Sequence, residues 1–210
     1  MRSARCRRYM KLNRFGYLGR PAMELDEMTT SNYVGTAPYR FGQAVSAGEI
    51  RAHCLRMAAE LRTEYRDKNP ILIGVLNGCF IFMADLIRAM NIPCEVDFIK
   101  LSSYRDNMAS GEITLLKDVD ANLEGRHIIL VEDIVDSGRS FGFLRRHLLS
   151  RKPASLVMAV MFVKERAEAE AAGAEYVGMM IPDVFVVGYG LDYAQQWRQL
   201  PDLYALVKDE

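Results

Sequence analysis

The segment His127–Ser140 places the tightest constraint on what this chain can fold into. It begins with the apolar, β-branched run Ile128–Val131, which is typical of a strand buried on both faces. Small and hydroxyl-bearing residues follow at Ser137–Ser140, and the apolar run Phe141–Leu144 indicates the start of a helix. A strand, a small-residue loop and a helix N-terminus together form a nest of backbone N–H groups that suits a phosphate.

Carboxylates stand directly before this loop, at Glu132, Asp133 and Asp136. Acids would weaken a loop that held only a phosphate, because like charges repel. The hydroxyl groups of a sugar, and a Mg²⁺ ion held between carboxylate and ligand oxygens, both account for them. The alternative is a strand that ends in solvated acids, with a helix N-cap at Ser137 or Ser140. The ordered combination favours a site for a phosphorylated ribose.

The composition indicates one globular domain with balanced charge. The chain has 210 residues, and 27 basic and 27 acidic residues give a formal net charge of zero, so no overall basic field indicates a nucleic-acid partner. Its cysteines are widely spaced without a C-x-x-C pair, which favours a reducing compartment over a zinc site or a disulfide scaffold. No apolar run has the length of a membrane-spanning helix, so we expect a cytoplasmic protein without a membrane partner.

Residues Met1–Ala22 form a basic leader that contains no acidic residue. Three interpretations compete: a targeting segment, a disordered basic arm, and upstream sequence translated ahead of a start at Met23. The leader lacks the apolar core of a secretory signal, and it is short and poor in serine for an organelle transit peptide. We favour a disordered or non-native leader and expect a single folded domain over residues 23–210.

Strand-like and helix-like segments alternate through the middle of the chain. A helix is expected from Ser46 to about Arg66, because Ser46 and Glu49 fit a capping box and apolar residues then recur at helical spacing. Residues 24–43 show no clear period and predict an irregular lead-in, and residues 102–112 predict a polar loop able to move. We expect further helices at 79–87, 141–150 and 165–173, and strands at 71–76, 94–101, 113–116, 127–131, 155–163, 176–181 and 185–188.

This alternation predicts an α/β fold with a parallel, doubly wound sheet. In such sheets ligands bind beyond the carboxyl ends of the strands. Asn77 and Gly78, the acidic stretch, Lys164 and the residues from Phe185 onward all fall at or near such ends. The predicted fold therefore gathers these side chains at one edge of the sheet.

The segment Val131–Ser140 resembles the phosphoribosyl-pyrophosphate (PRPP) signature of type I phosphoribosyltransferases, in their hypoxanthine-guanine branch. That branch typically reads V-E-D-I-[IV]-D-[ST]-G-[KR]-[ST], and every position fits. The resemblance covers roughly Pro70–Leu206. It implies a twisted, mostly parallel sheet flanked by helices, a small hood subdomain built from the chain ends, and a homodimer or homotetramer. The reaction that it implies is attack by a purine nitrogen on the anomeric carbon of PRPP, with loss of pyrophosphate.

The resemblance also implies roles for residues of the signature. Asp136 matches the proton-transfer residue that faces purine N7. Glu132 and Asp133 match the acidic pair that meets the ribose hydroxyls and a Mg²⁺ ion. The cradle for the 5′-phosphate is matched by Ser137, Gly138, Arg139 and Ser140.

The purine site implied by the resemblance lies further along the chain. Lys164 matches the lysine that donates to the purine 6-oxo group, which speaks against adenine because its 6-amino group is itself a donor. Phe185 matches the aromatic residue that stacks on the base, and Val186 matches a backbone contact to it. Both also fit a plain core strand, and this alternative is stronger for Val186.

Other matched residues concern the metal, the pyrophosphate and the closing of the site. Asp192 matches a carboxylate that belongs to the purine site and binds Mg²⁺, and Arg198 matches a pyrophosphate-binding arginine. Ser103 and Tyr104 match the start of the family's mobile lid, which shuts water out of the site.

Asn77-Gly78 is the one departure from the family pattern, which commonly has Lys-Gly after a non-proline cis peptide bond. Asn77 retains the backbone role in binding pyrophosphate, together with Gly78, but it lacks the lysine's charge. Either pyrophosphate affinity or a subunit contact made by that lysine is therefore in question. We predict a cis bond between Leu76 and Asn77.

Three hypotheses for function follow. The first is a 6-oxopurine phosphoribosyltransferase that converts hypoxanthine and guanine to IMP and GMP with Mg²⁺. The second is a xanthine-preferring enzyme, because the C2 edge that separates these bases is read by backbone carbonyls that side-chain identity does not report. The third is a PRPP-sensing regulator that binds nucleic acid. Such a regulator would need a basic face or a helix-turn-helix, and outside the leader the sequence shows neither.

Overall fold

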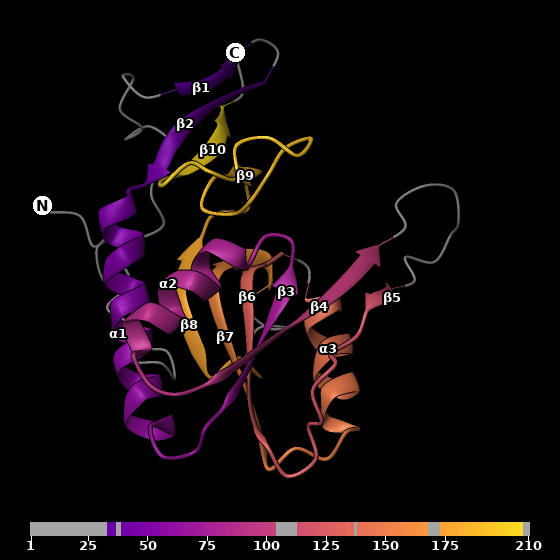
Figure 1. Cartoon of the computed structure of the whole chain (residues 1–210). Coiled ribbons are helices and arrows are strands. Elements are labelled where there is room, and N and C mark those ends of the chain that lie inside the picture. Colours follow the sequence, from indigo (N-terminus) through magenta and orange to yellow (C-terminus); the bar gives the residue numbers. More distant parts are fainter. Residues whose placement is uncertain (1–32, 37–38, 104–112, 137, 168–172, 208–210) are drawn as a thin grey trace, which may run out of the picture.

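The computed structural model describes residues 33–36, 39–103, 113–136, 138–167 and 173–207 (Figure 1). The basic leader, Tyr104 and Ser137 lie outside the described residues, as do the side chains of Ser103 and Arg139. Within the described part, no helix is long and apolar enough to cross a membrane.

A six-stranded sheet forms the centre of the described structure, in the strand order β5-β4-β3-β6-β7-β8. All neighbouring strands pair in parallel except β4 and β5, which are antiparallel. The sheet is therefore mostly parallel, which confirms the predicted fold class. Its strands are β3 (Ile71–Leu76), β4 (Glu95–Ser103), β5 (Ile113–Lys117), β6 (His127–Val135), β7 (Ser155–Lys164) and β8 (Tyr176–Ile181).

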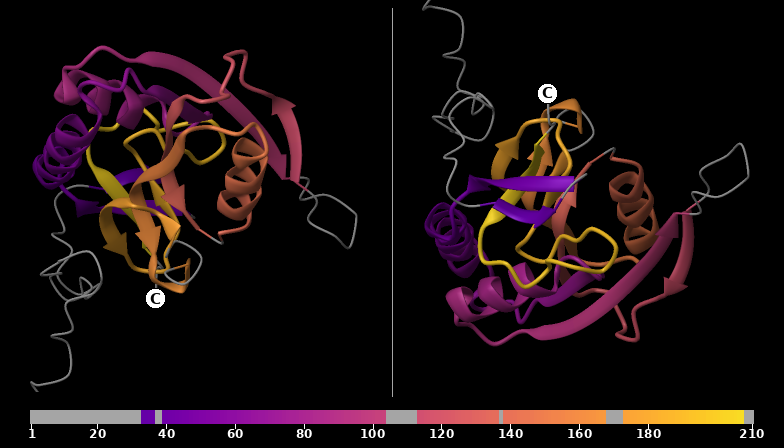
Figure 2. Two further views of the ribbon diagram at one scale, coloured as in Figure 1. Left: turned by 90° about the horizontal axis from the view of Figure 1, so that it is seen from below. Right: turned by 90° about the horizontal axis from the view of Figure 1, so that it is seen from above.

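Helices cover both faces of this sheet (Figures 1 and 2). On one face α1 (Ala47–Tyr65) and α2 (Phe80–Met90) pack in a core that includes Ile129 and Val131 of β6. On the other face α3 (Arg139–Leu149) packs in a core that includes the alternating residues of β6. Successive strand side chains point to opposite faces, so an apolar strand such as β6 contributes to both cores.

The predicted capping box begins α1. The hydroxyl of Ser46 accepts a hydrogen bond from the Glu49 N–H (3.3 Å), and the Glu49 carboxylate accepts one from the Ser46 N–H (3.1 Å). The Asp202 carboxylate also accepts a hydrogen bond from the Ala47 N–H (2.6 Å). The start of α1 is thereby tied to the C-terminal part of the chain.

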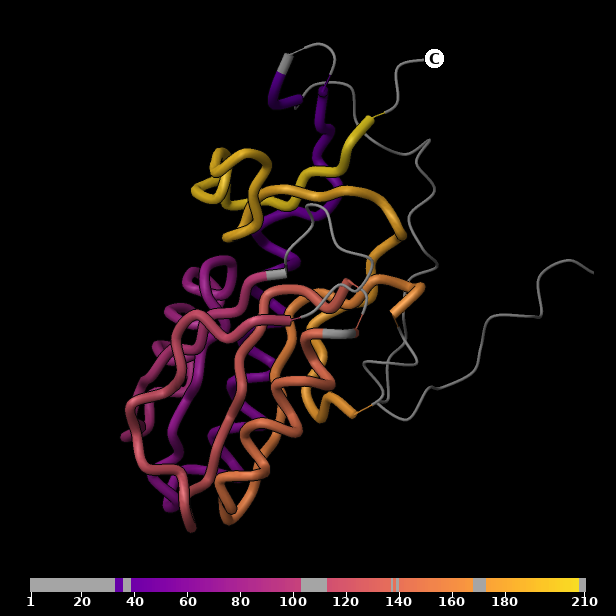
Figure 3. The backbone as a smooth tube through the Cα atoms, turned by 90° about the vertical axis from the view of Figure 1, so that its right-hand side faces the viewer, coloured from indigo at the N-terminus to yellow at the C-terminus, as the bar shows by residue number. Residues whose placement is uncertain are grey.

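The hood is a second sheet above the carboxyl ends of the parallel strands (Figure 3). Its four strands in the described residues are all antiparallel, in the order β1-β2-β10-β9. Residues from both chain ends thus form one unit, as expected. Its strands are β1 (Tyr33–Thr36), β2 (Tyr39–Val45), β9 (Val186–Val187) and β10 (Leu203–Val207).

Two expectations for the chain ends were wrong. The irregular lead-in predicted over 24–43 contains β1 and most of β2, and β10 was not expected at all. These strands are short, and their pairing joins residues far apart in the sequence, such as Leu206 with Phe41. Local periodicity carries no information about such pairing.

Two further boundaries differ from expectation. The helix predicted at 165–173 begins as a short 3₁₀ helix, η2 (Glu165–Ala167), and residues 168–172 lie outside the description. Strand β6 also extends to Val135, so Glu132 and Asp133 lie within the strand and not in a loop after it.

Candidate active site

The turn after β3 brings the backbone close to the acidic part of β6. The peptide bond between Leu76 and Asn77 is cis, as predicted, and the Asn77 side chain is exposed. A Cβ atom on Gly78 would lie only 1.7 Å from an oxygen of Asp133. Gly78 is therefore needed for close packing against this carboxylate.

Glu132 and Asp133 are buried, each with 8% of its surface exposed. Burial, together with the charge of Asp133, raises the pKa of Glu132 to about 8. Burial also raises the pKa of Asp133 to about 6, although backbone N–H groups and the charge of Arg198 act to lower it. The alternative of solvated acids at a strand end does not hold for this pair.

The two carboxylates face a pocket at the carboxyl ends of β3 and β6. One oxygen of Glu132, Oε2, is buried without a hydrogen-bond partner among the described residues. A buried carboxylate oxygen without a partner is costly, and a hard cation or a set of hydroxyl donors would satisfy it. The lining consists of Val75, Leu76, Gly78, Leu101, Ile113, Glu132, Asp133, Ile134 and Ser140.

Asp192 is not part of this carboxylate pair. Among the described residues, no three acidic, histidine or cysteine side chains form a cluster that could by itself hold a metal ion. The charge of Asp192 nevertheless raises the pKa of Asp133. The pair of Glu132 and Asp133 therefore suits a Mg²⁺ ion that takes its other ligands from water and substrate, which is the usual arrangement for this ion.

The end of the signature is a helix N-terminus of the kind that binds phosphate. Gly138 stands at the N-cap of α3 with φ +69°, and no side chain of the described residues caps this helix. The first N–H groups of α3 are therefore available to an anion. Ser140 lines the pocket beside them. The alternative of a serine N-cap at Ser137 or Ser140 is wrong, because the N-cap is glycine.

Lys164 and Asp136 meet at the carboxyl ends of β7 and β6. Lys164 is the last residue of β7 and is buried, and its Nζ lies 2.7 Å from Oδ1 of Asp136. Burial acts to raise the pKa of Asp136, but hydrogen bonds from Lys164 and Arg166 hold it below its ordinary value. The structure thus brings together the two residues predicted to contact the purine.

Sequence reasoning missed two charged residues that complete this group. Arg166, in η2, contacts Oδ1 of Asp136 through Nη2 (2.6 Å) and the Asp136 carbonyl through Nε (3.2 Å). Asp183, in the connection between β8 and β9, lies 3.1 Å from Nη1 of Arg166. The only available signal was the position of Arg166 two residues after the end of a strand that carries a site residue.

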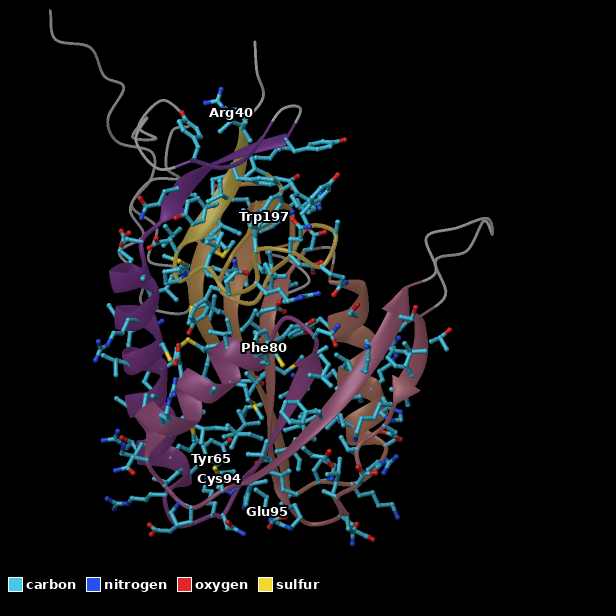
Figure 4. The ribbon with its side chains drawn as sticks, turned by 45° about the horizontal axis from the view of Figure 1, so that its top comes forward. Arg40, Tyr65, Phe80, Cys94, Glu95 and Trp197 are labelled. Carbon is cyan, nitrogen blue, oxygen red and sulfur yellow. The ribbon has the colours of Figure 1, made fainter. Side chains whose placement is uncertain are left out.

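Phe185 is half exposed, and the hood holds its ring. Its centroid lies 5.9 Å from that of Tyr193, edge-on, and 6.2 Å from that of the fully buried Phe41. Trp197, which also lies in the hood (Figure 4), stacks on Tyr193. With 43% of its surface exposed, Phe185 still offers aromatic surface on which a flat ligand could stack. Val186 is buried in the core and pairs with Ala205 of β10, as the alternative interpretation of its side chain predicted.

Asp192 and Arg198 form an ion pair in the loop between β9 and β10. Oδ1 of Asp192 lies 2.6 Å from Nη2 of Arg198, and Nη1 of Arg198 donates to the carbonyl of Gly190 (2.8 Å). A Cβ atom on Gly190 would lie 2.0 Å from the carbonyl oxygen of Gly78. This close approach brings the loop that carries the pair against the turn after β3.

Comparisons with known proteins identify the family. The family model for the phosphoribosyl transferase domain matches residues 45–194. The hypoxanthine-guanine phosphoribosyltransferase of Bacillus subtilis is 42% identical over 158 residues, which cover 75% of this chain and 88% of that protein.

Solved structures give the same result. A hypoxanthine-guanine phosphoribosyltransferase from Bacillus anthracis, with a HEPES molecule in its active site, has a TM-score of 0.73 and 37% identity, covering 79% of this chain and 98% of that one. The enzyme from L. donovani has a TM-score of 0.71 and 37% identity, covering 79% and 99%. With these likenesses in sequence and fold, the chain belongs to the hypoxanthine-guanine phosphoribosyltransferases of the phosphoribosyl transferase domain family.

Proposed function

We propose that this chain transfers the 5-phosphoribosyl group of PRPP to hypoxanthine and guanine, giving IMP or GMP and pyrophosphate, in purine salvage. The observation that carries the proposal is the pairing of Asp136 with Lys164 directly after the end of β6, the strand whose Glu132 and Asp133 line the pocket. Together these residues supply a proton acceptor, a donor for a 6-oxo group and acids for a sugar.

The sugar phosphate would bind at the start of α3. The N–H groups after Gly138 would hold the 5′-phosphate, with Ser137, Arg139 and Ser140 adding donors. Glu132 and Asp133 would accept hydrogen bonds from the ribose hydroxyls and hold a Mg²⁺ ion, and Asp192, outside this pair, would bind Mg²⁺ from the loop between β9 and β10. When bound, that ion supplies positive charge to the departing pyrophosphate.

Pyrophosphate would lie against the cis turn at Asn77 and Gly78 and near Arg198. Asn77 offers a backbone N–H and an uncharged side chain there, so Arg198 would carry more of the charge neutralisation. Ser103 and Tyr104 would begin the lid that excludes water from the oxocarbenium-like transition state.

The purine would stack on the exposed surface of Phe185, with Val186 contacting its edge through the backbone. Lys164 would turn from Asp136 to donate to the 6-oxo group. As the N9–C1′ bond forms and the C1′–O bond to pyrophosphate breaks, Asp136 would accept the proton that the base loses at N7. A carboxylate kept ionised by adjacent cations is ready for this step.

The proposal also covers the oligomeric state, the location and the domain bounds of the chain. We propose a homodimer or homotetramer, a cytoplasmic location, and one folded domain over 23–210 with the leader 1–22 outside it. No observation on the described residues favours xanthine preference or a PRPP-sensing regulator that binds nucleic acid, and each has a distinct outcome in the assay below.

The test is an assay of PRPP-dependent nucleotide formation with hypoxanthine, guanine and xanthine side by side. We expect turnover of the first two, and a fall of about 10²–10⁴-fold in kcat for Asp136→Asn, which removes the proton acceptor. Asp67→Asn is the matched control, since Asp67 is an exposed aspartate paired with an arginine far from the site.

Each contrary outcome has a clear meaning. Turnover of xanthine alone would show that the chain is a xanthine-preferring enzyme. No product with any base, together with a salt-sensitive shift on nucleic acid, would favour the regulator. Unchanged turnover in Asp136→Asn would remove that residue from proton transfer.

A further inference from the structure

Arg166 joins three segments of the candidate site. Its Nη2 lies 2.6 Å from Oδ1 of Asp136, and its Nε donates to the Asp136 backbone carbonyl at 3.2 Å. Its Nη1 lies 3.1 Å from Oδ1 of Asp183, two residues before Phe185. One side chain therefore links the start of the phosphate loop, the end of β7 and the segment that carries the stacking ring.

We infer that Arg166 is a positioning residue that holds Asp136 at the purine while Lys164 is occupied by the base. This inference rests on the proposed function. It assigns a role to a residue outside the signature, on a segment whose local sequence predicted an ordinary helix.

The contacts of Oδ1 of Asp136 explain why a second cation is needed. This oxygen accepts from both Lys164 (2.7 Å) and Arg166 (2.6 Å). When Lys164 turns to a 6-oxo group, Asp136 loses one partner. Arg166 then remains as the cation paired with the Asp136 carboxylate, and it keeps that carboxylate oriented toward the base.

The guanidinium of Arg166 can fix the orientation of Asp136 better than a lysine ammonium could. A guanidinium is planar and binds through several N–H groups at once, so contacts to the carboxylate and the backbone carbonyl of one residue restrict its rotation. Asp183 anchors the other end of the guanidinium and lies 4.0 Å from Nζ of Lys164. The charged side chains facing Asp136 from the described elements are thus Lys164 from β7 and Arg166 from η2, with Asp183 behind them.

The exposure of Arg166 argues against a role in folding stability alone. The Arg166 side chain is 49% exposed, so its ion pairs are of the kind that contributes little to folding stability. An effect of its removal on catalysis would therefore not follow from unfolding.

The test is a double-mutant cycle of Arg166→Ala and Asp136→Asn, read as kcat/KM for hypoxanthine at saturating PRPP. We expect Arg166→Ala to lower kcat/KM by about 10²-fold in the wild-type background, because loss of position at a reacting group has this size of effect. In the Asp136→Asn background it should change kcat/KM by less than about 2-fold, since a residue that acts through Asp136 has nothing left to position.

Three further measurements complete the design. Arg166→Lys should recover part of the loss, because it keeps the charge but not the two-point contact. Arg66→Ala is the control, as Arg66 is an exposed arginine that pairs with Asp67. Thermal unfolding of every variant checks the fold, and Arg166→Lys replaces Arg166→Ala in the cycle if the latter does not fold.

Two results would overturn the inference: wild-type kcat/KM in Arg166→Ala, or equal losses in the two backgrounds, which would show a role independent of Asp136. Failure of the proposed function looks different, because the wild-type chain would then form no nucleotide from any base.

Discussion

The contact between Gly78 and Asp133 can be tested by adding a single methyl group. In Gly78→Ala the new Cβ would lie 1.7 Å from Oδ2 of Asp133 and 2.7 Å from its Cγ. The backbone of Gly78 has no positive φ, so alanine is compatible with its conformation and the clash is the main consequence. The substitution therefore acts on Asp133, a residue proposed to hold the ribose and Mg²⁺.

The size of the effect follows from the distances. Ordinary van der Waals contact begins near 3.4 Å, so the methyl group and the carboxylate oxygen must separate by about 1.7 Å. Asp133 is buried and packed, so the turn or the carboxylate has to move. Overpacking of this kind costs about 1–3 kcal/mol, which for a domain of this size lowers the Tm by about 2–12 °C. Displacement of a binding group by this distance lowers kcat/KM for PRPP by about 10²-fold.

The assay combines thermal unfolding with steady-state kinetics in which PRPP is varied. Gly142→Ala is the matched control, because it also adds one methyl group but lies within α3, where the nearest atom is Nη1 of Arg146 at 3.5 Å. Alanine is a better helix former than glycine, so this control should gain about 0.5–1 kcal/mol of stability and keep wild-type activity. A Gly78→Ala variant with wild-type Tm and wild-type kcat/KM for PRPP would show that the reasoning about this contact is wrong.

Three further predictions concern the acids, the base and the pyrophosphate. Burial raises the pKa of Glu132 from 4.5 to about 8, so between these values the folded chain binds more protons than the unfolded chain, and its free energy of unfolding falls as pH rises. Glu132→Gln should flatten that fall in thermal unfolding measured across this range without substrate, and a level wild-type profile would contradict the burial argument. Phe185→Leu should raise KM for hypoxanthine about 3- to 10-fold with KM for PRPP unchanged, because only the aromatic stacking is lost; equal changes in both constants would refute stacking. Asn77→Lys adds a cation at an exposed position and should lower KM for pyrophosphate in the reverse reaction, whereas an unchanged value would place pyrophosphate elsewhere.

Local sequence patterns were sufficient for the elements of the central sheet. The capping box at Ser46 and Glu49 predicted where α1 begins, because both partners lie within one turn of helix. The apolar run of β6 and the small residues after it predicted a buried strand and a helix N-terminus, since burial on both faces and a tight turn select residue types directly. The cis bond before Asn77 was predicted from family resemblance.

Contacts between distant residues decided the rest. The hood pairs Phe41 with Leu206, and no local period marks two short strands so far apart in the chain. The burial that raises the pKa values of Glu132 and Asp133 arises from packing by neighbouring strands and from the Gly78 turn. The sequence alone thus predicted most strands and helices of the central sheet and the helix N-terminus after Gly138. Only the tertiary structure brought Arg166 and Asp183 to Asp136, because an ion pair between segments depends on where the chain returns.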